Sequence, residues 1–302
     1  MVPAYQLAVA AVPRLCKKGG YSQVSEDAYY LFARAGGIVR GGLFDGVGGM
    51  RRHSIKPHLY SSALATSCFA HAASAAAAGK RASLAGCFET LSSGWEDVRA
   101  ACTLGGSTAL VWAIDPIIGL VAQGLGDCTL LVVRRGGVFA LSERTAVKFD
   151  RPLQLGFLSP ENEPFFQVPQ DCTPFGPVAL EEGDTVLCVS DGVTDNLHAE
   201  ELVHLVGEGR PASALALAVI EAAQSAAVDG GRDGPFALAA KDNDIVWTAG
   251  GRLDDITALV VRCSGVGGAF APTPTTAPPF QSVSQALLPG NAAATASPLQ
   301  LF

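Results

Sequence analysis

The sequence has little charge and lacks the features typical of nucleic-acid and membrane proteins. Only 16% of its 302 residues are charged, and 28 acidic residues against 21 basic ones give a formal net charge of −7. Lys and Arg occur in no block longer than a pair, so no basic field is available to phosphate backbones. No apolar run reaches the ~20 residues that a membrane span needs. We therefore expect a soluble protein with no membrane span and no nucleic-acid partner.

The sequence also lacks any cysteine pattern with a chemical meaning. Its 8 cysteines are scattered, without a CxxC pair or a Cys/His cluster at zinc spacing. None is placed in a loop that could cradle a phosphate with backbone N–H groups, so a cysteine nucleophile is rejected. The cysteines are interpreted as reduced, mostly buried small hydrophobic residues.

What the chain does have is 49% hydrophobic residues, enough for a substantial core. Apolar and β-branched runs bounded by glycines predict strands at 5–12, 38–44, 109–114, 119–125, 129–133, 185–190 and 256–262. Helical spacing of apolar residues predicts helices at 57–78, 83–101, 199–206 and 212–227, with at least one further turn within 235–247. Ser83 is a plausible N-cap of the second helix. The order of these elements indicates an α+β fold rather than a regular βαβ repeat.

One domain is expected over residues 4–263. Residues 264–302 are rich in Ala, Pro, Thr, Ser and Gly, carry no charge, and are predicted to form a disordered tail. A docking role for this tail is the less favoured alternative. At the other end, the first apolar stretch has no basic residue ahead of it and no Ser/Arg enrichment, which argues against a signal or transit peptide.

Acidic residues stand where predicted strands end or tight turns begin. They are Glu26-Asp27, Asp45, Asp191 and Asp254-Asp255. A strand that ends in a carboxylate beside a Gly-rich turn places a hard oxygen ligand, suited to magnesium or manganese, at a sheet rim. Singly, each Asp-Gly is more often an ordinary turn. Jointly, the carboxylates would repel one another if they converged without a cation.

The order and the amino-acid sequences of these segments resemble those of the type 2C (PPM) metal-dependent phosphatase family over nearly all of residues 21–262. The matching segments are SEDAYY, FDGVGGM, GGSTALVW, GLGDCTLLVVRRGG, LCVSDGVTDNL and GGRLDDITALVV. The run DGVGGMRRHSIKPHLYSSAL and the stretch PLQLGF are similar to the compact branch of the family found in plastids and mitochondria. The resemblance implies a central β-sandwich of two antiparallel sheets flanked by helix pairs, with a binuclear Mg²⁺ or Mn²⁺ site at one end.

By motif, the resemblance also assigns ligands. Asp45 would bridge both metals, and Gly46 would offer its carbonyl oxygen. Asp191 and Asp254 would complete the protein ligands of one metal. Water polarised between the metals would attack phosphorus in line, without a phosphoenzyme. Asp45, Asp191 and Asp254 are therefore also the candidate catalytic residues.

Further residues would act around this pair of metals. Glu26 and Asp27 would hold metal-bound waters, and Asp127 would help bind a weaker third metal. Thr108 would support the ligands from behind. Asp255 is interpreted as a turn or supporting residue beside a ligand.

The sequence departs from the family pattern at two positions. Where many members have a His that is proposed to protonate the leaving alcohol, this chain has Val47; His53 is a weak substitute, and a water could serve instead. Where many members have an Arg that grips the substrate phosphate, this chain has Ser22. The candidate replacements are Lys17, Lys18 and Arg51, although ordinary surface charge explains each of them as well.

The resemblance predicts a monomeric protein serine/threonine phosphatase acting on phosphoproteins, located in a plastid or mitochondrion, otherwise in the cytoplasm. Three alternatives remain open at this stage. A pseudophosphatase would use the same fold as a binding module, although intact Asp45, Asp191 and Asp254 argue against it. A hydrolase of small phosphate esters would use the same chemistry in a deep closed pocket. A purely structural domain would leave the acidic strand ends unexplained.

Overall fold

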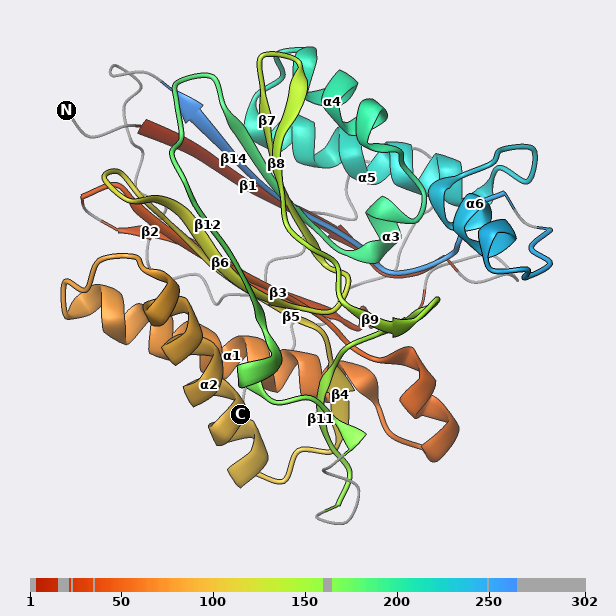
Figure 1. The fold of residues 1–302 in the computed structure, drawn as a ribbon, viewed down its shortest axis with the longest axis horizontal. Helices are drawn as coiled ribbons and strands as arrows, with labels where there is room; N and C mark the ends of the chain where they lie inside the picture. Colours follow the sequence, from red (N-terminus) through yellow and green to blue (C-terminus); the bar gives the residue numbers. More distant parts are fainter. Residues whose placement is uncertain are drawn as a thin grey trace, which may run out of the picture.

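The computed structural model describes residues 4–15, 22, 24–34, 36–159, 165–248 and 250–264, which form a β-sandwich of two five-stranded antiparallel sheets (Figure 1). The first sheet has the order β1 (Ala4–Val12), β14 (Ile256–Ser264), β13 (Thr185–Val189), β7 (Thr129–Arg134) and β8 (Gly137–Leu141). The second has the order β12 (Thr173–Val178), β6 (Gly119–Leu125), β5 (Ala109–Asp115), β3 (Ile38–Asp45) and β2 (Asp27–Arg34). The predicted α+β sandwich is confirmed.

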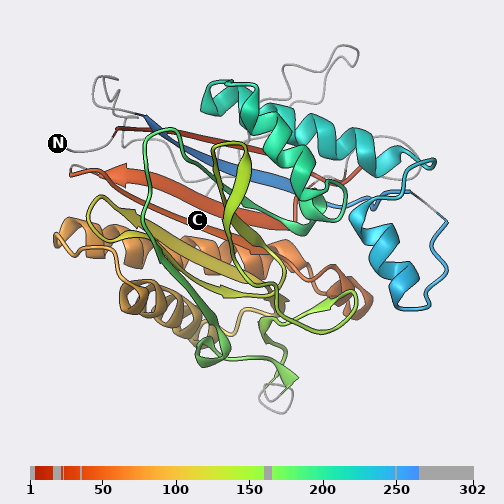
Figure 2. The ribbon, with the colours of Figure 1, turned by 45° about the horizontal axis from the view of Figure 1, so that its top comes forward.

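Helices cover the outer face of each sheet (Figure 2). The paired helices α1 (Pro57–Ala77) and α2 (Leu84–Ala100) pack on the second sheet, and α4 (Ala199–Gly207) and α5 (Ala212–Val228) pack on the first. Short elements complete the fold: η1 (Gly48–His53), β4 (Gly105–Ser107), β9 (Ala146–Lys148), β10 (Arg151–Pro152), β11 (Leu155–Phe157), η3 (Pro169–Asp171), α3 (Asp191–Thr194) and α6 (Pro235–Asp242). In the described part of the chain, no helix combines the length and the apolar character needed to cross a bilayer.

The central strands are apolar on both faces because each sheet lies between two apolar layers. In β5, Leu110 and Trp112 point into the core between the sheets, while Ala109 and Val111 point toward α1 and α2. The two sets alternate because successive side chains of a strand face opposite sides. This explains why such strands read as continuous apolar runs in the sequence.

The predicted helices and the predicted strands occur close to their expected bounds. Ser83 caps α2, and its Oγ accepts a hydrogen bond from the Gly86 N–H at 2.9 Å. The sequence reading did not assign β2, β8 and β12, which are three of the four edge strands of the two sheets. β12 has the sequence TPFGPV, whose two prolines interrupt the strand pattern, whereas β8 is a short apolar segment, GVFAL, whose side chains are largely exposed.

The predicted tail lies outside the described residues except for Ser264, which is the last residue of β14. The domain boundaries at 4 and 263 stay a prediction.

Candidate metal centre

Two neighbouring strands bring Asp27 and Asp45 together at one end of the sandwich. Asp45 is the last residue of β3 and pairs with Asp27, the first residue of β2, in the antiparallel ladder. Thr108 fixes the backbone of Asp45 on the other side: its Oγ1 accepts a hydrogen bond from the Asp45 N–H at 3.1 Å, and its own N–H donates to the Asp45 carbonyl at 2.9 Å. The position of Thr108 is that of a residue supporting Asp45 from behind.

Carboxylates from the first sheet reach the same end. Asp191 opens α3 directly after β13, and Asp127 lies in the turn between β6 and β7. One carboxylate oxygen each from Asp45, Asp127 and Asp191 lie within 4.8 Å of one another. The structure thus brings together acidic residues that are separated by up to 146 positions (191 − 45) in the sequence.

Both Asp-Gly pairs are explained by close backbone packing and not by a left-handed backbone. A Cβ on Gly46 would lie 2.8 Å from the Glu26 carbonyl oxygen, and a Cβ on Gly192 would lie 2.0 Å from the Asp255 carbonyl oxygen. The space is so small because Gly46 donates its N–H to the Glu26 carbonyl at 3.0 Å. Glycine therefore lets the loops at the metal centre pack against one another.

The adjacent residues Asp254 and Asp255 have different surroundings. Asp254 points toward the cluster and is 3.2 Å from Nη2 of Arg252. Asp255 points the other way, and its carboxylate accepts hydrogen bonds from the N–H groups of Arg14 at 2.6 Å and Glu26 at 2.8 Å. Asp255 thereby joins the end of β1 to the start of β2, which is the supporting position expected for it.

Burial and mutual repulsion raise the pKa values of these carboxyl groups. Burial, then the charges of Asp191 and Asp27, raise the pKa of Asp45 well above its ordinary value. Burial and Asp191 raise the pKa of Asp254 to about 8 and that of Asp127 to about 7. The pKa of Asp27 is also well above its ordinary value, because of burial and the charge of Asp255. Such a group cannot be fully ionised near neutral pH unless a cation compensates it.

The donor set fits divalent cations. Both carboxylate oxygens of Asp27 and Oδ1 of Asp127 are buried and have no hydrogen-bond partner among the described residues. Buried polar atoms normally have partners, so these oxygens keep lone pairs that a ligand could use. The neighbouring hydroxyls of Ser190 and Thr257 lower the pKa of Asp27 less than burial and Asp255 raise it. Clustered carboxylates with spare oxygens are the ligands that Mg²⁺ and Mn²⁺ prefer.

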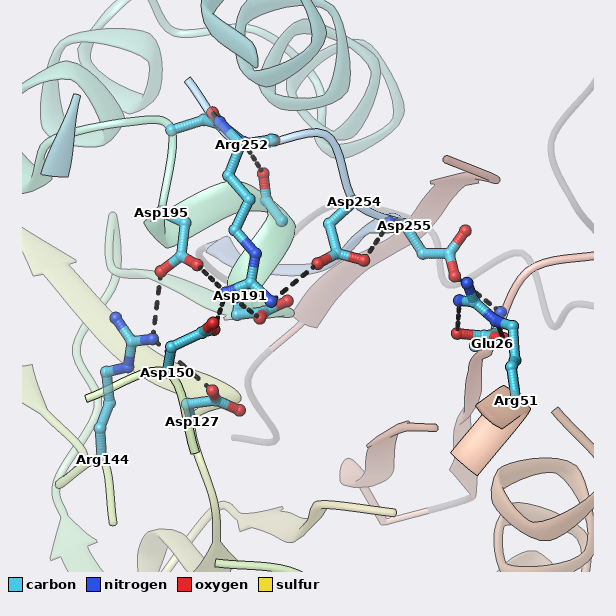
Figure 3. A network of polar contacts seen from close by, with 12 residues as sticks. Glu26, Arg51, Asp127, Arg144, Asp150, Asp191, Asp195, Arg252, Asp254 and Asp255 are labelled. Carbon is cyan, nitrogen blue, oxygen red and sulfur yellow. Dashed lines mark hydrogen bonds and ion pairs between the residues drawn. The ribbon is translucent and has the colours of Figure 1, made fainter. Parts of the chain in front are cut away.

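Two arginines that the sequence reading did not assign lie among the carboxylates (Figure 3). Nη1 of Arg252 is 2.8 Å from Asp195, 2.9 Å from Asp150 and 3.5 Å from Asp191. Nη2 of Arg144 is 3.3 Å from Asp195 and 3.9 Å from Asp127. Asp195 follows Asp191 by four residues. This spacing could have indicated a shared helical face, whereas nothing in the sequence pointed to Arg144.

Glu26 lies at the other side of the centre, paired with Arg51. Nε of Arg51 donates to Oε1 of Glu26 at 2.6 Å, and its Nη2 donates to Oε2. The pair stands apart from Arg252 in Figure 3, with Arg51 in η1 and Glu26 directly before β2. Arg51 therefore pairs with the Glu26 carboxylate, which by the resemblance would hold a metal-bound water.

The other residues considered for binding phosphate or for donating a proton have fewer contacts with the centre. His53 is exposed at the end of η1, and the Ser22 hydroxyl donates to the Val24 carbonyl at 3.1 Å. Lys17 and Lys18 lie outside the described residues. The spacing of Cys128 and Arg134 matches CxxxxxR, but the residues between them form β7, and burial raises the pKa of the Cys128 thiol well above its ordinary value.

Comparison with known proteins gives a consistent result. No protein-family model matches the chain. It is 29% identical over 259 residues to Protein phosphatase PTC7 homolog fig of Drosophila pseudoobscura pseudoobscura, covering 80% of this chain and 74% of the fly protein. It is 27% identical over 261 residues to Probable protein phosphatase 2C 26 of Arabidopsis thaliana, covering 83% of this chain and 80% of the plant protein.

Solved structures share the fold. The photosystem II phosphatase PBCP superposes with a TM-score of 0.72 at 23% identity, covering 86% of this chain and 98% of PBCP. The Mycobacterium smegmatis PPM Ser-Thr phosphatase MsPP gives 0.55 at 18% identity, covering 85% and 97% of the two chains. The catalytic domain of PstP, solved with 2 manganese ions, gives 0.53 at 17% identity, covering 86% and 100%. With its acidic strand ends gathered at one end of this sandwich, the chain is similar in sequence to protein phosphatases of the type 2C (PPM) class and shares their fold.

Proposed function

We propose that this chain hydrolyses phosphoserine and phosphothreonine in proteins at the Asp45–Asp191 end of the sandwich, without a phosphoenzyme. The observation that supports this most directly is the convergence of Asp45, Asp127 and Asp191, whose oxygens lie within 4.8 Å of one another. The raised pKa of Asp45 supports it too, because burial and four neighbouring carboxylates leave this group in need of a cation.

Asp45, Asp191 and Asp254, with the Gly46 carbonyl, would hold two divalent ions, either Mg²⁺ or Mn²⁺. When bound, these ions supply a hydroxide nucleophile near neutral pH and neutralise the phosphoryl oxygens. Asp127 would contribute to a third, weaker site. Asp27, whose two oxygens have no hydrogen-bond partner among the described residues, would orient water at the centre.

The remaining roles follow from contacts around the centre. Thr108 hydrogen-bonds both the N–H and the carbonyl of Asp45, which fixes the backbone that carries the carboxylate proposed to hold both metals. Glu26 would hold water only if its ion pair with Arg51 opens or leaves a lone pair available. Val47 has no ionisable group, so the proton for the leaving alcohol comes from water rather than from this side chain.

The test is hydrolysis of a phosphothreonine peptide by the purified protein with Mn²⁺, with Mg²⁺ and with excess EDTA. We expect turnover that requires metal and that is lost in Asp191→Asn, while the exposed Asp242→Asn serves as the matched control. Absence of turnover by the folded, metal-supplied protein on phosphopeptides would refute the proposal and favour the pseudophosphatase. Turnover of p-nitrophenyl phosphate alone would favour a hydrolase of small esters.

We further propose that the protein is a monomer and acts in a plastid or mitochondrion. The likeness to PBCP, a photosystem II phosphatase, supports the plastid. Fractionation of the source cells with an antibody against the protein tests the compartment, and recovery in the cytosolic fraction alone would contradict it. Light scattering of the purified chain tests the monomer.

A further inference from the structure

We propose that Arg252 binds the phosphoryl group of the substrate in this chain; this rests on the function proposed above. The centre has to bind a dianionic phosphoryl group, and Ser22, at the position where an arginine would grip it, offers only a hydroxyl that donates to the Val24 carbonyl. A cation must therefore come from elsewhere in the fold.

Three described guanidinium groups border the centre, those of Arg51, Arg144 and Arg252. Arg51 donates hydrogen bonds from Nε and Nη2 to Glu26. Arg144 contacts Asp195 at 3.3 Å and is 3.9 Å from Asp127. Of the three, Arg252 is the one in contact with two proposed ligands, Asp191 at 3.5 Å and Asp254 at 3.2 Å. It is therefore the guanidinium that lies nearest to the place where phosphate has to bind.

The fold holds Arg252 in a defined position. The buried side chain of Asn196 receives the Arg252 N–H at Oδ1 and donates Nδ2–H to the Arg252 carbonyl, both at 2.8 Å. The ring of Phe236 lies 4.9 Å from the Arg252 Cζ. A side chain that is anchored by its backbone and stacked on an aromatic ring loses little further entropy when it binds a ligand.

The contacts of its two terminal nitrogens differ in a way that suits phosphate binding. Nη1 makes the two short contacts, to Asp195 at 2.8 Å and Asp150 at 2.9 Å, and neither carboxylate is an assigned ligand. Nη2 contacts Asp254 at 3.2 Å. If Asp254 and Asp191 held a divalent cation, Nη1 would stay anchored by Asp195 and Asp150, and Nη2 would become available to an anion. A guanidinium fork matches the spacing of phosphoryl oxygens.

The side chain is also accessible, because 25% of it is exposed to solvent despite its four carboxylate neighbours. Arg252 follows two glycines in GGRLDD, and Gly251 has no room for a Cβ, which would lie 2.4 Å from the Ala226 carbonyl. The loop is thus packed tightly against α5, and the arginine extends from a rigid base.

The experiment measures binding of inorganic phosphate to the Mn²⁺-loaded protein by calorimetry, which does not depend on turnover. We expect Arg252→Ala to weaken phosphate binding by at least ~10-fold and Arg252→Lys, which keeps the charge but loses the fork, to lie between it and the unmodified protein. Arg135→Ala, which removes a guanidinium that is 83% exposed in the β7–β8 turn, is the matched control and should change nothing.

Two measurements on the same variants separate this role from its rivals. Equal phosphate affinity in Arg252→Ala and the unmodified protein, with tighter Mn²⁺ binding in the variant, would mean that Arg252 is only a counter-charge and would overturn the proposal. A loss confined to Arg51→Ala would overturn it in favour of Arg51. Circular dichroism tests whether each variant is folded. If Arg252→Ala unfolds, Arg252→Lys takes its place, because it preserves the charge beside Asp195 and Asp150.

Steady-state kinetics separate the proposal from the function on which it rests. With a phosphothreonine peptide, Arg252→Ala should raise KM and lower kcat/KM, while Arg135→Ala should leave both unchanged. Arg252-dependent phosphate binding in a protein that hydrolyses no phosphopeptide would support the phosphate site and refute the proposed function. Normal turnover with no effect of Arg252→Ala on KM or on phosphate binding would refute the phosphate site and support the proposed function.

Discussion

Asp27 stands directly opposite Asp45 in the ladder between β2 and β3, and neither carboxylate oxygen of Asp27 has a hydrogen-bond partner among the described residues. Directly opposed like charges in an antiparallel pair are destabilising. Burial adds to this, since the pKa values of both groups are raised well above the ordinary value of Asp. The strand register thus creates an electrostatic cost that a bound divalent cation would offset.

The first prediction concerns Asp45→Asn. The amide removes the charge that would bridge two metals, so we expect kcat/KM on a phosphothreonine peptide to fall by ~10³-fold or more. The thermal midpoint of the metal-free variant should not fall, because the change removes one of the repelling carboxylates. Asp242→Asn, at the exposed end of α6, is the control and should leave activity unchanged. Activity at the unmodified level in Asp45→Asn would show that the centre is wrongly assigned.

The second prediction concerns the pH dependence of metal-free stability. The pKa values of Asp195, Asp127 and Asp254 are raised to about 6, about 7 and about 8 in the fold. In the unfolded chain they are near ~3.9. The folded state therefore binds more protons between these limits, and its free energy of unfolding decreases as pH rises from the unfolded to the folded pKa values.

Thermal melts in EDTA should accordingly show a lower midpoint at pH 8.5 than at pH 5.5, which are our chosen conditions, roughly above the highest of these folded pKa values and below the lowest. Mn²⁺ should raise the midpoint more at the higher pH, because carboxylates bind metal in their deprotonated form. Asp254→Asn should flatten the metal-free dependence. A midpoint that increases with pH in EDTA would contradict the repulsion that the raised pKa values express.

The third prediction separates the adjacent residues Asp254 and Asp255. Asp255 accepts N–H groups from Arg14 and Glu26, so Asp255→Asn leaves at least one buried N–H without an acceptor and should lower the free energy of unfolding by about 2 kcal/mol. Asp254→Asn should instead weaken Mn²⁺ binding without lowering metal-free stability. Urea unfolding and calorimetric Mn²⁺ titration of both variants measure the two effects. Equal losses of stability would show that the two residues share one role.

The inner strands and the long helices could be predicted because burial on both faces leaves a strong apolar signal. β5 and β6 are examples, with nearly every side chain buried. The edge strands β8 and β12 could not. β12 pairs with β6, which is distant in the sequence, and β8 pairs with the adjacent β7 but leaves most of its side chains exposed. Strand formation there is a consequence of tertiary context, not of local pattern.

The acidic residues of the centre could be proposed from sequence because they stand at strand ends or tight turns in segments that resemble the type 2C motifs. The basic residues could not. Arg144 lies in the loop after β8, and its direction toward Asp195 depends on how that loop crosses the first sheet. Arg252 precedes Asp254 by two residues, and its direction toward the carboxylates depends on the Asn196 hydrogen bonds to its backbone and on the ring of Phe236. Side-chain direction in loops is set by contacts that spacing does not encode.

The last prediction concerns the two glycines Gly192 and Gly207, which differ in their surroundings. A Cβ at Gly192 would lie 2.0 Å from the Asp255 carbonyl oxygen, whereas a Cβ at Gly207, at the end of α4, would meet no heavy atom within 4 Å. Gly192→Ala should therefore force α3 and the Asp254–Asp255 loop apart, lower the free energy of unfolding by about 1–3 kcal/mol and weaken Mn²⁺ binding through Asp191. Gly207→Ala, the matched control, should be neutral or stabilising by about 0.5 kcal/mol, because alanine has the higher helix propensity. Urea unfolding and Mn²⁺ titration measure both variants. Unchanged metal affinity in a destabilised Gly192→Ala would mean that Asp191 is positioned by β13 alone, and not by the contact between α3 and the loop that carries Asp254.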